Sequence, residues 1–258
     1  MRQFLKSFAG WRSSASRHDQ NEGIPNILRP DAPFYAVGDI HGRADLLADL
    51  LARIEANEAE KIVFLGDYVD RGPDSAATLK LLFDLQQRRP DQIVCLMGNH
   101  EKMMCDFIDD PLDRGAIWLR NGGLATLASF GITNIDAKPT ADQSIEACDA
   151  LEAALPTDIA AWLAGLPLSW NSGNIWCAHA AMDPEVDPGK QRSRTLLWGN
   201  RAFLNAPRQD EICVIHGHTI VDRPFNMNSR IAIDTGAYKT GRLTAAYISH
   251  AKCDFIST

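Results

Sequence analysis

The sequence predicts an α/β fold with a second sheet packed on the first and a helical insertion in the middle of the chain. Three observations lead to this prediction. From Phe34 onward, three short apolar runs alternate with helical patterns, an order that is typical of parallel strands. Residues 106–168 are rich in helical patterns. The residues after Leu168 hold shorter apolar runs separated by turn residues, which predicts the second sheet.

The first half of the chain supplies three strands and two helices. Apolar and β-branched residues predict the strands at residues 34–37, 61–65 and 93–97. The first helix carries apolar residues on one face: Leu46, Leu47, Leu50, Leu51 and Ile54. The second helix is expected to begin at Asp74 or Ser75, because either side chain can accept a hydrogen bond from the first turn, and to end near Pro90.

The second half changes from helices to strands. Helical patterns in the insertion lie at residues 117–130, 144–155 and 157–166. Four further strands are predicted at residues 174–178, 212–215, 230–233 and 243–248. Residues 171–173, with the sequence Asn-Ser-Gly, predict a hairpin turn before the first of them.

Composition and charge argue against several classes of protein. The chain of 258 residues has 26 basic and 33 acidic side chains, whereas proteins that bind nucleic acid by bulk electrostatics carry a basic excess. No run reaches the roughly 18 apolar residues that suggest a transmembrane segment. The six cysteines form no C-x-x-C pair and no signal peptide precedes them, so we expect a cytoplasmic location. The sequence leaves the oligomeric state open.

Residues 1–30 differ from the rest of the chain, because they are basic and rich in turn-forming residues. Phe4, Phe8 and Trp11 fall on one face of a short helix, but this run is very short for a helix that lies on a membrane. We therefore interpret residues 1–30 as an N-terminal arm, flexible or strapped to the surface. Residues 31–258 are predicted to form a single domain.

Polar residues follow the predicted strands at the points where the strands end. The motifs are GDIHG from Gly38, GDYVDRG from Gly66, GNHE from Gly98, CAHA from Cys177 and HGHT from His216. Ligands of α/β sheets bind outside the carboxyl ends of the strands, so these side chains are expected to converge. A glycine before the polar residue lets the backbone turn sharply and approach a ligand closely.

The donor set of these motifs predicts a site for divalent metal ions. Oxygen and imidazole ligands without thiolates suit Mn, Fe(II) or Zn. Six residues are predicted as ligands: Asp39, His41, Asp67, Asn99, His179 and His218. Asp67 can bridge two ions, with water in the open positions that a catalytic site needs. Without an ion, so many polar groups at strand ends would repel or desolvate one another.

These motifs resemble those of the metallophosphoesterase superfamily, and specifically its phosphoprotein phosphatase branch. The resemblance covers residues 33–248, and the helical middle and the IDTGA segment (Ile233–Ala237) are most similar to compact bacterial and phage members. It implies a two-sheet β-sandwich flanked by helices in α/β/β/α layers, with residues 106–168 as an insertion or cap. It also implies hydrolysis of phosphomonoesters at two divalent metal ions. Mn²⁺ is the first choice for these ions, and Fe²⁺, Zn²⁺, Co²⁺ and Ni²⁺ are the alternatives.

A histidine and an aspartate beside the ligands are predicted to supply a proton. His100 neighbours Asn99 without obviously being a ligand, and a departing alkoxide needs a proton donor. Asp70 is placed to accept a hydrogen bond from this imidazole and to keep it protonated. The resemblance implies the same pair as the general acid.

Two arginines are expected to bind the phosphate. Arg71 follows the second motif directly, and a guanidinium can bind two phosphate oxygens at once. The resemblance places the second arginine in the segment LLWGNR, with Arg201 as the first choice and Arg194 as the second.

Three functions remain open at this point. The first is a protein serine/threonine phosphatase, with tyrosine as a further target, acting on a phosphorylated protein or peptide. The second is a symmetrical dinucleoside tetraphosphate hydrolase, a related enzyme that usually has Ala-Arg-Gly in the second motif and Asp at the end of the third. Asp70 and Glu101 follow the phosphoprotein pattern and favour the first function. The third, a non-catalytic metal-binding scaffold, would lack a ligand or the acid pair, and none is missing.

Four other polar residues near the motifs have separate interpretations. Glu101 is predicted to accept hydrogen bonds rather than to bind metal, and His216 to be a core histidine or a support for a ligand. Asp234 is expected either to orient a ligand histidine or to cap a turn. Asn121 resembles a residue near the site in bacterial relatives, and we expect it beside the substrate groove.

Overall fold

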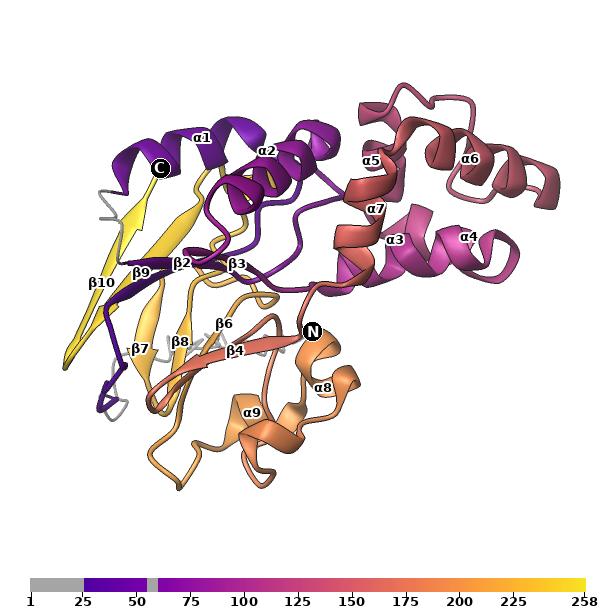
Figure 1. Ribbon diagram of the computed structural model, residues 1–258. Helices are drawn as coiled ribbons and strands as arrows, with labels where there is room; N and C mark the ends of the chain where they lie inside the picture. The colour runs from indigo at the N-terminus through magenta and orange to yellow at the C-terminus, as the bar shows by residue number, and fades with distance from the viewer. Residues whose placement is uncertain (1–25, 55–59) are drawn as a thin grey trace, which may run out of the picture.

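Two five-stranded sheets pack face to face in the described part of the chain, residues 26–54 and 60–258 of a computed structural model (Figure 1). Helices cover the outer face of each sheet, and a lobe of further helices extends from one end. The predicted α/β fold with α/β/β/α layers and a helical insertion is confirmed.

The first sheet has the strand order β10-β9-β1-β2-β3. Its parallel strands are β1 (Phe34–Val37), β2 (Lys61–Phe64) and β3 (Ile93–Cys95). Its antiparallel strands are β9 (Thr244–Ser249) and β10 (Lys252–Ser257). The prediction that residues 243–248 belong to the second sheet is wrong, because β9 pairs with β1. An apolar run predicts a buried strand but does not specify its partner.

The second sheet has the strand order β4-β5-β6-β8-β7. Three parallel strands form its centre, namely β5 (Ile175–Ala178), β6 (Cys213–His216) and β8 (Arg230–Ala232). The antiparallel edge strands β4 (Ser169–Ser172) and β7 (Phe225–Met227) were not predicted as strands. Both are short and contain polar residues, so their hydrophobic pattern is weak.

Alternation along β1 shows how the layers are held together. Phe34 and Ala36 pack in the apolar cluster between the two sheets. Tyr35 and Val37 face the opposite way, into the cluster that contains α1 (Ala44–Arg53) and α2 (Ser75–Arg88). The N-terminus of α2 is capped by Asp74, whose side chain accepts a hydrogen bond from the N–H of Ala77.

Two short helices cover the outer face of the second sheet (Figure 1). They are α8 (Ser193–Trp198) and α9 (Arg201–Asn205). Leu196 of α8 and Phe203 of α9 pack with Ala178 and Val214 of the sheet. A 3₁₀ turn at Pro188–Lys190 precedes α8, and the short helix α10 (Ala237–Thr240) follows β8.

The helical lobe lies beside the sheets rather than on them (Figure 1). Its helices are α3 (Asn99–Asp109), α4 (Pro111–Trp118), α5 (Leu124–Ser129), α6 (Ala141–Ala154) and α7 (Thr157–Ala164). The insertion was predicted to begin near residue 106, but its first helix begins at Asn99, inside the GNHE motif. None of the described helices is long and apolar enough to cross a membrane.

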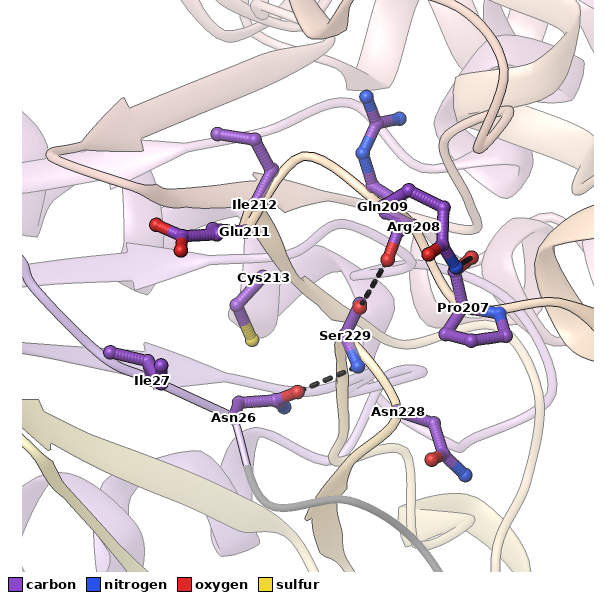
Figure 2. A pocket seen from close by; sticks show the side chains of 10 residues that line it. All are labelled: Asn26, Ile27, Pro207, Arg208, Gln209, Glu211, Ile212, Cys213, Asn228 and Ser229. Carbon is purple, nitrogen blue, oxygen red and sulfur yellow. Dashed lines mark hydrogen bonds between the residues drawn. The ribbon is translucent and has the colours of Figure 1, made fainter.

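Residues 26–30, predicted as the end of the arm, are strapped to the second sheet. Leu28 is buried between the sheets, and the backbone of Arg29 accepts a hydrogen bond from Asn174. The Asn26 side chain accepts a hydrogen bond from the N–H of Ser229 at 2.6 Å (Figure 2). The rest of the predicted arm, including Phe4, Phe8 and Trp11, lies outside the described residues.

Candidate metal centre

The parallel strands of both sheets present their polar motifs at one edge. In the first sheet, the segments after β1, β2 and β3 carry six of the predicted residues: Asp39, His41, Asp67, Asp70, Asn99 and His100. In the second sheet, His179 follows β5 and His218 follows β6. Five residues of these motifs adopt a positive φ: His41, Asp67, Asp70, Arg71 and His218. Residues other than glycine rarely adopt this backbone conformation, and such strain is concentrated at functional sites.

Four predicted ligands direct their donor atoms at one point. His179 Nε2 lies 2.9 Å from Asn99 Oδ1, 3.2 Å from His218 Nδ1 and 3.3 Å from Asp67 Oδ1. His218 Nδ1 lies 2.9 Å from the same Asn99 oxygen. A set of two oxygens and two imidazole nitrogens at this spacing can hold a divalent ion.

A second group of donors shares Asp67 with the first. Ligand-capable atoms of His41, Asp67 and His100 lie within 4.8 Å of one another, and His41 Nε2 is 3.4 Å from Asp67 Oδ2. Burial raises the pKa of Asp67, but the imidazoles of His179, His100 and His41 around it outweigh burial and lower the pKa overall. Asp67 is therefore shared by the two groups of donors, the position that a bridging ligand would need.

Asp39 reaches this edge from β1 and contacts the loop after β6. Its oxygens accept the backbone N–H of His218 at 3.2 and 3.0 Å. A Cβ at Gly217 would lie 1.9 Å from Asp39 Oδ1, so the close approach requires glycine. Burial, and then the charges of Asp234 and Asp67, raise the pKa of Asp39 well above its usual value. A cation at this position would remove that penalty, which fits a ligand role.

Backbone carbonyls orient two of the predicted ligand histidines. His41 Nδ1 lies 2.8 Å from the Val69 oxygen, and His179 Nδ1 lies 3.1 Å from the Leu65 oxygen. With Nδ1–H donating to the carbonyl, Nε2 keeps its lone pair for the cluster. Burial lowers the pKa of His41 to about 3 and that of His179 to about 4. Both imidazoles are therefore neutral near pH 7, the form that binds metal.

Glu101 holds together the loops that carry the ligands. Its Oε2 accepts the backbone N–H groups of Gly98 at 2.9 Å and Asp67 at 2.7 Å. Its Oε1 accepts those of Tyr68 at 2.7 Å and Val69 at 3.1 Å. The prediction that Glu101 is an acceptor of hydrogen bonds is confirmed.

Replacing Glu101 by Gln is expected to lower the free energy of unfolding by about 3 kcal/mol, because the amide NH₂ would face backbone N–H groups and leave them without an acceptor. Urea unfolding of the metal-free protein measures the change. The control is Glu185→Gln at an exposed position, for which a change within about 0.5 kcal/mol is expected. Equal unfolding free energies for the two variants would contradict the role of Glu101.

His100 and Asp70 form a buried pair beside the shared carboxylate. His100 Nδ1 lies 2.6 Å from Asp70 Oδ2. Burial lowers the pKa of His100, but the charge of Asp67 and the hydrogen bond and charge of Asp70 outweigh burial and raise it above its usual value. Asp70 Oδ1 also accepts hydrogen bonds from Thr126 Oγ1 at 2.6 Å and from the Trp118 indole at 3.1 Å.

Trp118 and Thr126 were not predicted to have this role, and both come from the helical lobe. Trp118 is fully buried, and its ring also packs against Phe107. The one signal in the sequence was the indole N–H itself, since a buried tryptophan usually finds an acceptor. The lobe therefore fixes the position of Asp70, the partner of the predicted proton donor.

Arg71 lies at the mouth of the first group. Its Nη1 lies 3.0 Å from His41 Nε2 and its Nη2 lies 2.9 Å from His100 Nε2. It also lies over the ring of Tyr238, 5.1 Å from the centroid, and the same ring meets His41 edge to face. Tyr238 was not predicted as part of the site, because no motif includes it. The tyrosine restricts where the Arg71 guanidinium can lie.

The two arginines considered for the second phosphate contact are placed differently. Arg201 begins α9 and lines, together with His218, a hollow of about 290 Å³. Arg194 is exposed on α8 and does not line that hollow. This arrangement favours Arg201, the first choice from the sequence.

The remaining predicted positions lie at the margin of the site. The buried His216 packs edge-on against Phe203 and lies outside both ligand groups, as predicted. Asp234 accepts the N–H of Gly236 at 2.8 Å, which is the turn-capping alternative. Asn121 lies in a π-helical turn, Leu119–Gly123, and its side chain donates to the Ile117 carbonyl of α4 at 2.8 Å.

Comparisons with known proteins agree with this geometry. The profile of the calcineurin-like phosphoesterase family matches residues 32–241. Serine/threonine-protein phosphatase 2 of Salmonella typhimurium is 28% identical over 220 residues, which cover 82% of this chain and 90% of that protein. The serine/threonine-protein phosphatase 4 catalytic subunit of Kluyveromyces lactis is 42% identical over 76 residues, 30% of this chain. The aligned part of the chain spans only 25% of that protein.

One solved structure supports the fold over nearly the whole chain. A candidate diadenosine tetraphosphatase superposes with a TM-score of 0.62 at 19% identity, over 91% of this chain and 97% of that one. At this level of identity the likeness establishes the fold and not the substrate. The family profile covers most of the chain, and the fold and the motifs at the strand ends agree with it. The chain therefore belongs to the calcineurin-like phosphoesterase family.

Proposed function

We propose that this protein hydrolyses phosphomonoesters with two divalent metal ions and acts as a protein serine/threonine phosphatase. One observation carries the proposal: the buried carboxylate of Asp67 belongs to two groups of ligand-capable atoms, one with His179 and His218 and the other with His41 and His100, and His100 is engaged by Asp70. Catalysis is assigned to a single domain, residues 31–258, in which residues 106–168 form the helical insertion.

The described residues fit a centre of two ions. Asp39, His41 and Asp67 would hold one ion, and Asp67, Asn99, His179 and His218 the other. The buried carboxylates of Asp39 and Asp67 support this, because both can be ionised together only beside compensating positive charge. The ions, when bound, polarise the phosphoryl group and make a water nucleophilic near neutral pH. We propose Mn²⁺ as the metal at both positions, and Fe²⁺, Zn²⁺, Co²⁺ or Ni²⁺ as alternatives.

His100 is the proposed proton donor for the departing alkoxide. Its Nδ1 is engaged by Asp70, so Nε2 is the nitrogen that faces the site. The charge of Asp67 and the hydrogen bond and charge of Asp70 raise the pKa of His100 despite its burial, which favours the protonated form that a general acid requires. The transferred proton leaves His100 neutral while Asp70 keeps the ring in place.

Arg71 and Arg201 are the proposed contacts to the phosphate oxygens. With His41 Nε2 used as a metal ligand, the Arg71 guanidinium keeps its donors for phosphate. Arg201 begins the helix that borders the hollow next to His218. Each guanidinium would donate two parallel hydrogen bonds to phosphate oxygens and so orient the phosphoryl group.

A phosphoprotein is proposed as the substrate, with tyrosine phosphate as a further target. Asp70 supports a phosphoprotein substrate, because this aspartate binds His100 and because the dinucleotide hydrolases usually have alanine at this position of the second motif. A bacterial relative named as a serine/threonine phosphatase, similar over most of the chain, points the same way. The fold likeness to a candidate diadenosine tetraphosphatase keeps dinucleotide hydrolysis as the second candidate. The six cysteines form no disulfide, which supports the proposed cytoplasmic location.

The experiment that tests this proposal compares two substrates on the same sample. With Mn²⁺ added, release of phosphate from a phosphoserine peptide is expected to exceed cleavage of diadenosine tetraphosphate by at least about tenfold in kcat/KM, a difference that pocket contacts can supply. A preference for the dinucleotide would reverse the order of the two candidates. Failure to hydrolyse p-nitrophenyl phosphate, phosphopeptide and dinucleotide alike would favour the non-catalytic scaffold.

A further inference from the structure

A hollow of about 290 Å³ adjoins the metal centre on the side of the second sheet. Its walls are the segment from Trp198 to Leu204, the small residues Ala180 and Ala181, and the predicted ligand His218. At about 30 Å³ for each water of the liquid, this volume corresponds to roughly ten waters, ample room for one large amino-acid side chain. Because His218 also belongs to the first group of donors, the hollow adjoins the place where the phosphoryl group would bind.

The lining of the hollow is largely apolar. Phe203 is buried at its base, while Trp198 and Leu204 keep 45% and 48% of their surface exposed. Asn200 also lines the hollow, but its amide donates to Asp183 at 2.8 Å and its oxygen accepts the N–H of Ala202 at 2.8 Å. Its polar atoms are thus used in holding α9. Exposed apolar side chains around a concave site are typical of a surface that receives an apolar group.

The wall formed by α9 is held rigidly from the second sheet. Arg230, at the start of β8, donates from Nη1 to the carbonyls of Phe203 at 2.9 Å and Leu204 at 2.8 Å. Its guanidinium lies over the Phe203 ring, 5.7 Å from the centroid. Because the hollow is formed before a ligand arrives, little conformational entropy is lost when it is filled.

We propose that this hollow is a specificity pocket for an apolar side chain of the substrate, on a residue that lies close in sequence to the phosphorylated one. The inference rests on the proposed protein phosphatase activity. Arg201 at the edge binds the phosphate, and Leu204 and Trp198 cover the neighbouring apolar side chain. Burial of that side chain against carbon atoms contributes to binding of the peptide, and a polar side chain there would forfeit this contribution.

The test compares phosphoserine peptides that differ at one position. Leucine or serine is placed at each of the two positions on either side of the phosphoserine, and kcat/KM is measured with Mn²⁺. At one of these positions the unmodified protein is expected to prefer leucine by about tenfold, the effect of burying a few methylene groups. Leu204→Ser and Leu204→Ala are expected to reduce this preference to within about twofold of unity, since they remove the methylene contacts.

The matched control is Leu112→Ser, because Leu112 is 56% exposed on α4, away from the hollow. This variant should keep the full preference for leucine. Equal rates for the leucine and serine peptides at every position, or an unchanged preference in both Leu204 variants, would overturn the pocket. If the Leu204 variants lost cleavage of diadenosine tetraphosphate but cleaved peptides normally, the hollow would be the binding site of an adenine ring instead. Absence of turnover in the unmodified protein would contradict the proposed function rather than the pocket alone.

Discussion

Replacing His100 by Asn is expected to lower kcat for a phosphomonoester by about 10² or more while the protein keeps its metal, following the usual contribution of a positioned acid. The reason lies in the geometry of the pair. His100 Nδ1 is fixed by Asp70 at 2.6 Å, and Asp70 is itself held by Thr126 and Trp118. Asparagine at position 100 removes the proton donor. Asp70→Asn removes the acceptor that keeps the imidazole oriented and protonated, so a loss of similar size is expected.

The measurement is turnover of p-nitrophenyl phosphate together with metal analysis of the same sample. His216→Asn is the matched control, because His216 is a histidine of equal burial that belongs to neither ligand group. A change in kcat of less than about fivefold is expected for this control, since His216 takes no part in proton transfer. An unchanged kcat in His100→Asn, with metal present, would remove the role of His100 as the proton donor.

Replacing Asp67 by Asn is expected to have the larger effect, with kcat/KM lowered by at least about 10³. Asp67 contributes to both groups of donors, with His41 Nε2 at 3.4 Å and His179 Nε2 at 3.3 Å from its oxygens. The amide keeps the shape of the side chain but removes the charge that two cations would share. Several kcal/mol of electrostatic stabilisation are at stake, and each 1.36 kcal/mol is a factor of ten in rate.

Metal content and activity are measured together after dialysis, and the activity is measured again in saturating Mn²⁺. The comparison is Asp234→Asn, because Asp234 is also a buried carboxyl but caps a turn through the N–H of Gly236. Asp67→Asn should lose both ions. Asp234→Asn should retain them and lose less than about tenfold in activity, which is the smallest loss usually seen when a residue that supports a metal ligand is replaced. Full metal content in Asp67→Asn would show that Asp67 is not the bridging ligand.

The central strands and most of the candidate site could be predicted from the sequence, because their signals are local. Short continuous apolar runs such as FYAV and KIVFL predict buried strands. Polar residues directly after such strands must lie at a sheet edge, so Asp39, Asp67 and His179 could be placed together without knowledge of the tertiary structure. Asp70 was likewise predicted as the partner of His100, and the two side chains lie within hydrogen-bond distance in the structure.

Other features depend on residues that are far apart in the chain and were decided by the tertiary structure alone. The position of β9 beside β1 follows from pairing across the whole domain, which an apolar run cannot specify. Trp118 and Thr126 reach Asp70 only because the lobe folds back on the loop after β2, and Tyr238 meets Arg71 only because α10 lies over the same loop. The sequence by itself therefore determined the donor atoms and the strand ends that carry them. The tertiary structure decided which side chains hold those donors in place, because such contacts depend on distances in space rather than on spacing along the chain.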